Sequence, residues 1–201
     1  RLGEASRNYI QSRFTTERLV RDLEELYETL RTQKRGVVKQ EHPKAAVQRY
    51  FDGDVTGYLT AYSQTNHARG EIFRERRRLA LDLIRDPLGR VLDVGSGPGV
   101  FTSALLERVG QCCTVDLSYE MVAAARKPLA GNPEAHRLQY GVADVECLPF
   151  QDRSFHTVLC IGVLQYLQTL HASLKELARV TRPGGQVIVS FPNSDAPLNR
   201  M

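Results

Sequence analysis

The segment from Arg90 to Val100 restricts the fold more than any other part of the chain. An apolar run enters the glycine-rich turn Gly95-Ser96-Gly97-Pro98-Gly99 and then an amphipathic segment. A strand that leads through such a turn into a helix is the opening unit of nucleotide-binding α/β sheets. Apolar strands and amphipathic helices alternate downstream of it. The sequence therefore predicts a doubly wound, mostly parallel, Rossmann-like sheet covered by helices.

The boundaries of these elements follow from the same periodicity. We expect strands over residues 90–95, 111–117, 137–143, 155–161 and 186–191. Helices are predicted over residues 99–109 and 118–127 and, after a break near Thr169, from Leu170 through Ala178. Residues 158–161 and 187–189 are apolar on both strand faces, which is typical of a parallel sheet with helices on each side.

Three parts can be distinguished along the chain. Residues 1–36 are predicted to form an amphipathic helical extension and linker, residues 43–88 helices that cap the core, and residues 89–201 the sheet domain. In the helix expected over residues 68–85, helical spacing places one apolar set inward, namely Ile72, Leu79, Ala80, Leu83 and Ile84. The arginines of this helix are expected on its outer side: Arg74, Arg76, Arg77 and Arg78.

Composition and charge bear on several classes of protein. The net charge of +4 comes largely from scattered arginines and gives no indication of nucleic-acid binding. No apolar run is long enough to cross a bilayer, and the first residues have no signal-peptide pattern. Cys112 and Cys113 are adjacent on a predicted strand and so face opposite sides, and none of the four cysteines has metal-ligand spacing. We expect reduced thiols, a cytoplasmic location and no metal site.

Two nucleotide chemistries compete for the glycine turn. A dinucleotide requires the pattern G-x-G-x-x-G/A, but Val100 stands at its third conserved position. Pro98 removes one backbone N–H from a phosphate cradle, and Asp93 would place a negative charge beside a pyrophosphate. The turn therefore favours a cationic ligand without phosphates, and an NAD(P)-dependent oxidoreductase stays as the alternative.

S-adenosylmethionine has the chemistry that this turn favours. Asp93 can attract its ammonium group, Asp116 ends the second strand where a carboxylate commonly binds ribose hydroxyls, and Asp144 ends the third strand where it can accept from the adenine amino group. Val145 or Met121 would pack on the adenine ring. Three glycines would let the backbone approach the cofactor: Gly95, Gly97 and Gly99.

Four segments carry a family resemblance: residues 91–106, 115–118, 141–150 and 177–185. They resemble successive motifs of class I S-adenosylmethionine-dependent methyltransferases, in the small-molecule subgroup that includes quinone and tetrapyrrole methylases. The resemblance implies methyl transfer to an oxygen, nitrogen or carbon nucleophile. With the residues above, it implies cofactor contacts at Ser96, Leu117, Cys160, Ile161 and Gly162. A module that keeps the fold without catalysis is the other alternative.

Departures from the family pattern leave the acceptor open. His156 stands where the family often has Asp, and Gln165 where it often has His. His171 is the weak candidate for a catalytic base, and no base is assigned, because positioning supplies much of the acceleration in methyl transfer. Tyr50 and Tyr58 are expected in a lid over the cofactor.

The N-terminal part carries a second, looser resemblance. Residues 9–20 and 26–30 resemble the C-terminal tail of a two-lobed (GT-B type) glycosyltransferase. This resemblance implies a glycosyltransferase fusion and a glycan or glycosylated acceptor. An apolar fifth strand left at the edge of a sheet would be exposed to pairing. We therefore expect a chain truncated after Met201, or a sheet edge covered by residues 1–31 or by another subunit.

Overall fold

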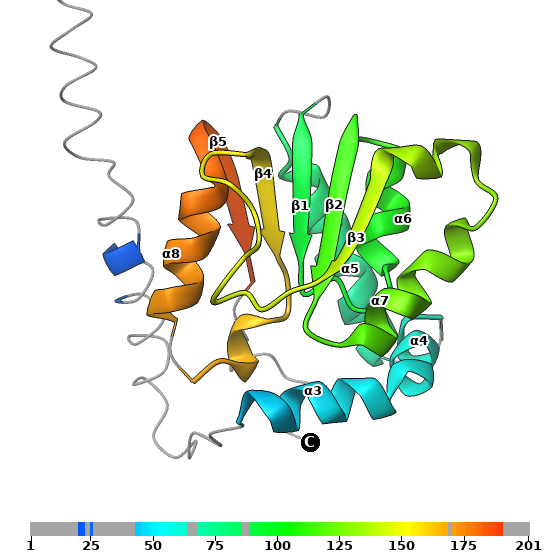
Figure 1. Ribbon diagram of the computed structural model, residues 1–201. Coiled ribbons are helices and arrows are strands. Elements are labelled where there is room, and N and C mark those ends of the chain that lie inside the picture. Colours follow the sequence, from blue (N-terminus) through cyan, green and yellow to red (C-terminus); the bar gives the residue numbers. More distant parts are fainter. Residues whose placement is uncertain are drawn as a thin grey trace, which may run out of the picture.

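The computed structural model describes residues 20–22, 25, 43–63, 68–85, 89–168 and 170–190. Its centre is a five-stranded sheet in which every pairing is parallel and the strand order is β3-β2-β1-β4-β5 (Figure 1). The strands are β1 (Arg90–Val94), β2 (Gln111–Asp116), β3 (Leu138–Val142), β4 (Phe155–Cys160) and β5 (Thr181–Val189). The predicted α/β fold is confirmed. Nearly all of the predicted extension over residues 1–36 lies outside the described residues.

Helices bury both faces of this sheet. They are α3 (Lys44–Gly53), α4 (Val55–Ser63), α5 (Ala68–Asp82), α6 (Val100–Leu106), α7 (Tyr119–Arg126) and α8 (His171–Val180). Alternate residues of β1 enter two cores: Leu92 packs with Leu177 of α8, whereas Val91 packs with Leu105 of α6. Short 3-10 turns connect the elements over Lys127–Leu129, Pro133–Arg137 and Leu164–Tyr166.

Strand alternation also separates the two neighbouring cysteines. Cys113 belongs to the core beneath α8 and Cys112 to the core beneath α5 and α6, as the sequence predicted. Together with Cys147 and Cys160 they are free thiols. In the described part of the chain, no three His, Cys, Asp or Glu side chains are grouped so that they could hold a metal ion.

The fifth strand begins earlier than predicted. Thr181 pairs with Phe155, and the next pairing joins Gln186 to Thr157, so the four residues 182–185 bulge out of the ladder. Gly184 has φ of +75° within this bulge, a conformation that favours glycine. Regular pairing resumes at Gln186, the predicted start of the strand.

The apolar face of α5 differs from the prediction. Leu79 and Leu83 are 50% and 56% exposed, whereas Ala80 and Leu81 are buried against the sheet. The small Ala80 side chain lets α5 pack closely on the sheet through Ala80 and Leu81. Leu79 and Leu83 therefore lie to one side of this contact. Ile84 is partly buried as expected, and the side chain of Ile72 lies outside the description.

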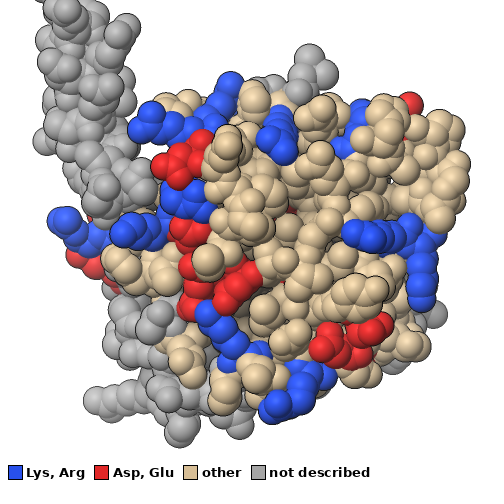
Figure 2. Space-filling view, viewed as in Figure 1, with Lys and Arg blue, Asp and Glu red and all other residues tan. Residues whose placement is uncertain are grey.

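The cap helices place α3 at the functional edge of the sheet. Figure 1 shows α3 lying across one end of the strands, with α4 beside it. Residues of α3 and the last residues of β1 and β2 line one cavity, so this is the carboxyl end of the strands. None of the described helices is both long and apolar enough to cross a membrane. The face drawn in Figure 2 carries basic and acidic groups interspersed.

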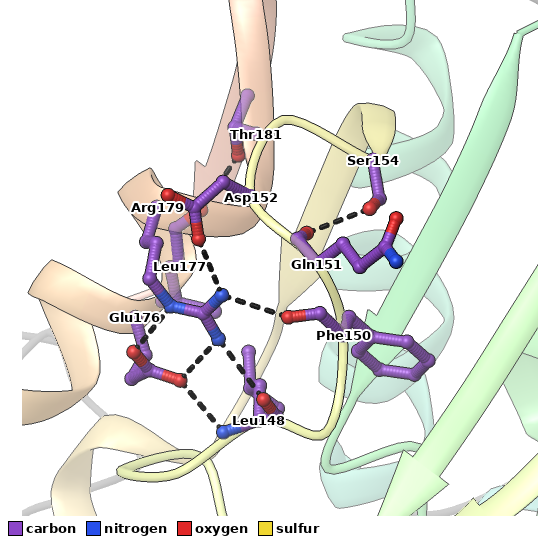
Figure 3. A network of polar contacts seen from close by, with 9 residues as sticks. All are labelled: Leu148, Phe150, Gln151, Asp152, Ser154, Glu176, Leu177, Arg179 and Thr181. Atoms are coloured by element: carbon purple, nitrogen blue, oxygen red, sulfur yellow. Dashed lines mark hydrogen bonds and ion pairs between the residues drawn. The ribbon is translucent and has the colours of Figure 1, made fainter.

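One arginine joins two distant segments on the α8 side of the sheet. Arg179 donates to both oxygens of Glu176, to Asp152, and to the carbonyls of Leu148 and Phe150, at 2.6–2.9 Å (Figure 3). Glu176 also accepts from the Leu148 N–H at 2.7 Å. The loop after β3, which carries Asp144 at its start, is thereby fixed to α8.

Replacing Arg179 by Ala should lower the free energy of unfolding by about 2–4 kcal/mol, because the Leu148 and Phe150 carbonyls and Glu176 lose their donor. Urea denaturation followed by circular dichroism measures this change. Arg78→Ala is the matched control, since Arg78 also forms two ion pairs but its side chain is 57% exposed, against 28% for Arg179. The control should be nearly neutral. Equal effects of both variants would show that the network has no special role.

Candidate functional site

A cavity opens at the carboxyl end of the sheet, between the strand ends and the cap helices. Its walls come from α3 and α4, the glycine turn, the β2–α7 junction, the loop after β3 and the segment after β4. The residues that line it are Lys44, Val47, Phe51, Tyr58, Val94, Gly95, Gly97, Asp116, Leu117, Met121, Ala143, Asp144, Val145, Gly162, Val163, Tyr166 and Leu167. In an open parallel sheet this edge is where ligands bind.

Asp116 connects the two loops on either side of this cavity. One carboxylate oxygen accepts from the Gly97 N–H at 2.8 Å and the other from the Ser118 N–H at 2.9 Å. Burial raises the pKa of Asp116, and these backbone donors oppose that shift. Each oxygen keeps a further lone pair, so the carboxylate can still accept from two hydroxyl groups of a ligand.

Two of the turn glycines have different surroundings. Gly97 has φ of +54°, and a Cβ there would stand 3.7 Å from the Tyr58 ring, at the cavity wall. Gly99 has φ of +79°, and a Cβ there would stand 2.8 Å from the Ala125 Cβ of α7. Gly99 therefore lets two helices pack closely and does not line the cavity, contrary to the prediction. Gly95 does line it.

Asp93 is buried behind the turn. Its side chain is 2% exposed, and Oδ2 has no hydrogen-bond partner among the described residues. Burial, reinforced by the negative charge of Asp116, raises the pKa of Asp93 to about 7. Asp93 lines a small pocket beside the main cavity, together with Ser96, Tyr58 and Tyr62. A hydrogen bond with Thr102 lowers the pKa of Asp93 but does not outweigh these two causes. A buried carboxyl group with one unpaired oxygen is suited to a cationic ligand group.

Asp144 lies at the opposite side of the cavity and already has a partner. Its Oδ1 accepts from the Glu146 N–H at 2.9 Å, and its Oδ2 accepts from Lys44 Nζ at 2.6 Å. Lys44 also pairs with Glu146, and the hydrogen bond to Asp144 is the main cause of its raised pKa. Sequence reasoning did not identify Lys44, because its role depends on where α3 crosses the sheet.

Aromatic rings form the wall on the α3 side. Phe51 stands edge-on to Tyr58 and Tyr166, with centroid separations of 5.9 and 5.2 Å. Tyr58, one of the two residues expected in a lid, lines the cavity, and burial raises its pKa. Tyr50 is 57% exposed and packs only on the edge of Phe51, so Phe51 occupies the place predicted for Tyr50.

The other predicted contacts divide into two groups. Leu117, Met121, Val145 and Gly162 line the main cavity, and Ile161 lines the small pocket beside it. Cys160 is fully buried in the α8-side core and does not line the cavity, because it points to the same side of β4 as Val158.

None of the histidines in the described part of the chain lines the cavity. His171 is exposed at the first residue of α8, and His156 accepts from the Arg90 N–H at the amino end of β1, away from the cavity. The titratable side chains that do line it are Lys44, Tyr58, Asp116, Asp144 and Tyr166. These groups can hold and orient a ligand, and no histidine base is found among the described residues of the site.

The charges fit S-adenosylmethionine better than a dinucleotide. Asp116 can still accept from a ribose diol, and Oδ2 of Asp93 lacks a partner in the neighbouring small pocket. Among the described residues, the one cation that lines the main cavity is Lys44, which is bound to two carboxylates and is poorly placed to neutralise a pyrophosphate.

Comparisons with known proteins agree with this geometry. Residues 92–189 match the methyltransferase domain family. A demethylmenaquinone methyltransferase of Corynebacterium urealyticum is 33% identical over 138 residues, 68% of this chain and 53% of the relative. A malonyl-[acyl-carrier protein] O-methyltransferase of Marinomonas sp. is 38% identical over 102 residues, 50% of this chain and 37% of the relative. The chain thus spans about half the length, or less, of these relatives.

Solved structures share the fold at low sequence identity. A methyltransferase from Thermotoga maritima has a TM-score of 0.62 at 23% identity, covering 76% of this chain and 65% of that one. The [4+2]-cyclase SpnF has a TM-score of 0.64 at 21% identity, covering 74% and 60%. Neither these structures nor the relatives above support the glycosyltransferase resemblance of residues 1–31 or the expected truncation.

The matched domain favours S-adenosylmethionine over a dinucleotide as the ligand of the glycine turn. Residues 92–189 of the chain match the methyltransferase domain family, and the sheet has the class I methyltransferase fold.

Proposed function

We propose that the chain transfers a methyl group from S-adenosylmethionine to a small, largely apolar nucleophile held against the aromatic wall. The observation that carries the proposal is that one cavity joins Asp116 and Asp144 on one side to Gly162, Phe51 and Tyr166 on the other. Polar groups suited to a nucleoside and an apolar surface suited to an acceptor are thereby continuous.

The acids and apolar residues of the cavity would hold the cofactor. Asp116 would accept from the ribose hydroxyls, Asp144 from the adenine amino group, and Asp93 would face the ammonium group. Leu117, Met121 and Val145 would pack on the adenine ring. When bound, the cofactor supplies an electrophilic methyl group on a sulfonium. The protein's task is then to orient the acceptor and exclude water, which can supply much of the rate enhancement.

The acceptor end favours a flat apolar molecule with an acidic proton. Its lining includes Phe51, Tyr58, Val163, Tyr166 and Leu167, and none of the described histidines lies there to remove a proton from a weak acid. An enol or hydroquinone would lose its proton without strong general-base help. The quinone-directed relative supports this acceptor class. A glycan acceptor or glycosyltransferase partner rests only on the resemblance of residues 1–31. The free cysteines support the cytoplasmic location expected from the sequence.

A turnover assay tests the proposal. The chain would be incubated with methyl-labelled S-adenosylmethionine and, separately, a demethylmenaquinone analogue, a malonyl thioester and an oligosaccharide. We expect label in the quinone-like acceptor. Binding of NADH without binding of S-adenosylmethionine would favour the oxidoreductase instead. Cofactor binding without transfer to any acceptor would favour the non-catalytic module.

Asp116→Asn should weaken S-adenosylhomocysteine binding by about 1–3 kcal/mol, because the amide accepts fewer hydrogen bonds from the ribose and leaves its partners unpaired. Isothermal titration calorimetry gives the dissociation constant, and thermal melting of the free variant checks that it folds. Glu120→Gln on the exposed first turn of α7 is the control and should bind like the wild type. An unchanged affinity for Asp116→Asn would remove Asp116 from the site.

Binding of S-adenosylhomocysteine should depend on pH through Asp93. The pKa of about 7 means that Asp93 is mostly protonated at pH 6 in the free protein, while a bound ammonium group favours the carboxylate. Binding should release a proton and be about tenfold weaker at pH 6 than at pH 8. Calorimetry in buffers of different ionisation enthalpy measures both effects. Asp93→Asn should lose the pH dependence, and its persistence in that variant would contradict this role.

A further inference from the structure

We propose that Arg76 on α5 is a carboxylate-binding residue at the methyl-transfer end of the site. The carboxylate would come from the methionine part of the cofactor or from an acidic acceptor, and the inference rests on the proposed function. Arg76 was expected on the outer side of its helix. It is instead partly buried, with the guanidinium carbon 4.9 Å from the centroid of the Phe73 ring.

The guanidinium lies beside the backbone of the segment after β4. Its Nη1 is 3.1 Å from the position that a Cβ would take on Gly162. Gly162 lines the main cavity after β4, whereas Asp144 lines it after β3, on the other side of β1 in the sheet. Arg76 itself lines the adjoining groove with Ile161 and Ser190, so Gly162 separates its guanidinium from the main cavity. Gly162 has φ of +76°, a backbone conformation that strains residues with a side chain. Because glycine has no side chain, the guanidinium of Arg76 can approach this backbone.

The charge of Arg76 lacks a carboxylate partner in the described part of the chain. Nη2 donates weakly to the Tyr62 hydroxyl at 3.4 Å, and Nε is buried without a hydrogen-bond partner. The neighbouring Arg78 forms an ion pair with Glu75, and Lys44 forms ion pairs with Asp144 and Glu146. Burying unpaired guanidinium nitrogens is unfavourable, so a bound anion would be stabilised here.

Asp93 and Arg76 together complement a zwitterion. Tyr62, which contacts Arg76, lines the same small pocket as Asp93, whose Oδ2 lacks a hydrogen-bond partner among the described residues. An amino acid end carries one ammonium and one carboxylate, and this pair of residues offers one opposite charge to each. This arrangement favours the methionine carboxylate of the cofactor as the source over an acidic acceptor.

Calorimetry with two ligands tests the proposal. S-adenosylhomocysteine carries the carboxylate, and its decarboxylated analogue lacks only that group. We expect Arg76→Gln to weaken binding of S-adenosylhomocysteine about 10- to 100-fold, because a charged hydrogen-bond pair is lost. The affinity for the decarboxylated analogue should change by no more than about twofold. Arg76→Lys should recover part of the affinity, because it keeps the charge without the fork. Arg77→Gln is the control on the same helix and should bind both ligands normally.

Benzoate as a probe distinguishes the other source. If Arg76→Gln leaves S-adenosylhomocysteine binding unchanged but abolishes binding of benzoate to the S-adenosylhomocysteine complex, the carboxylate belongs to the acceptor. Equal losses for both cofactor analogues, or no effect on either S-adenosylhomocysteine or benzoate, would overturn the proposal. Failure of the wild type itself to bind S-adenosylhomocysteine would instead contradict the proposed function. Thermal melting confirms that each variant is folded.

Discussion

The carboxylate of Asp116 is the contact on which the site depends. It binds the Gly97 N–H of the turn after β1 and the Ser118 N–H at the start of α7, so one side chain fixes two loops. Ser118 continues the connection, because its hydroxyl accepts from the Met121 N–H and donates to Asp52 on α3 at 2.5 Å. The glycine turn, the helix that follows β2 and the cap helix are therefore tied together around one buried acid.

The parallel sheet supplies the rest of the geometry. Because the strands run the same way, the residues after β1, β2, β3 and β4 meet at one edge. The loop after β3 would be the least restrained of these, since it continues for twelve residues before β4. Arg179 and Glu176 on α8 bind its middle (Figure 3). Lys44 on α3 binds Asp144 at its start. Ion pairs and hydrogen bonds from α8 and α3 thus restrain the loop between β3 and β4, which strand pairing does not.

Local patterns predicted the sheet, the turn and the acids at the strand ends, because strand periodicity and acid spacing are properties of short segments. Contacts between distant segments were beyond that reasoning. Lys44, Phe51 and Tyr166 reach the cavity only through the packing of α3 and of the segment after β4. Leu79 and Leu83 were misplaced because two neighbouring stripes of α5 are apolar, and Gly99 because a glycine pattern does not distinguish ligand approach from helix packing. Strand alternation from Val158 would have placed Cys160 correctly in the core.

The central claim is that the cavity between Asp116 and Asp144 binds an adenosyl group without phosphates. A two-dimensional amide NMR titration of the chain with S-adenosylhomocysteine, repeated with NADH, tests it most directly. The account predicts saturable shifts with S-adenosylhomocysteine at the three amides that donate to these acids, those of Gly97, Ser118 and Glu146, and little change with NADH. Shifts at these amides with NADH alone, or none with S-adenosylhomocysteine, would contradict it.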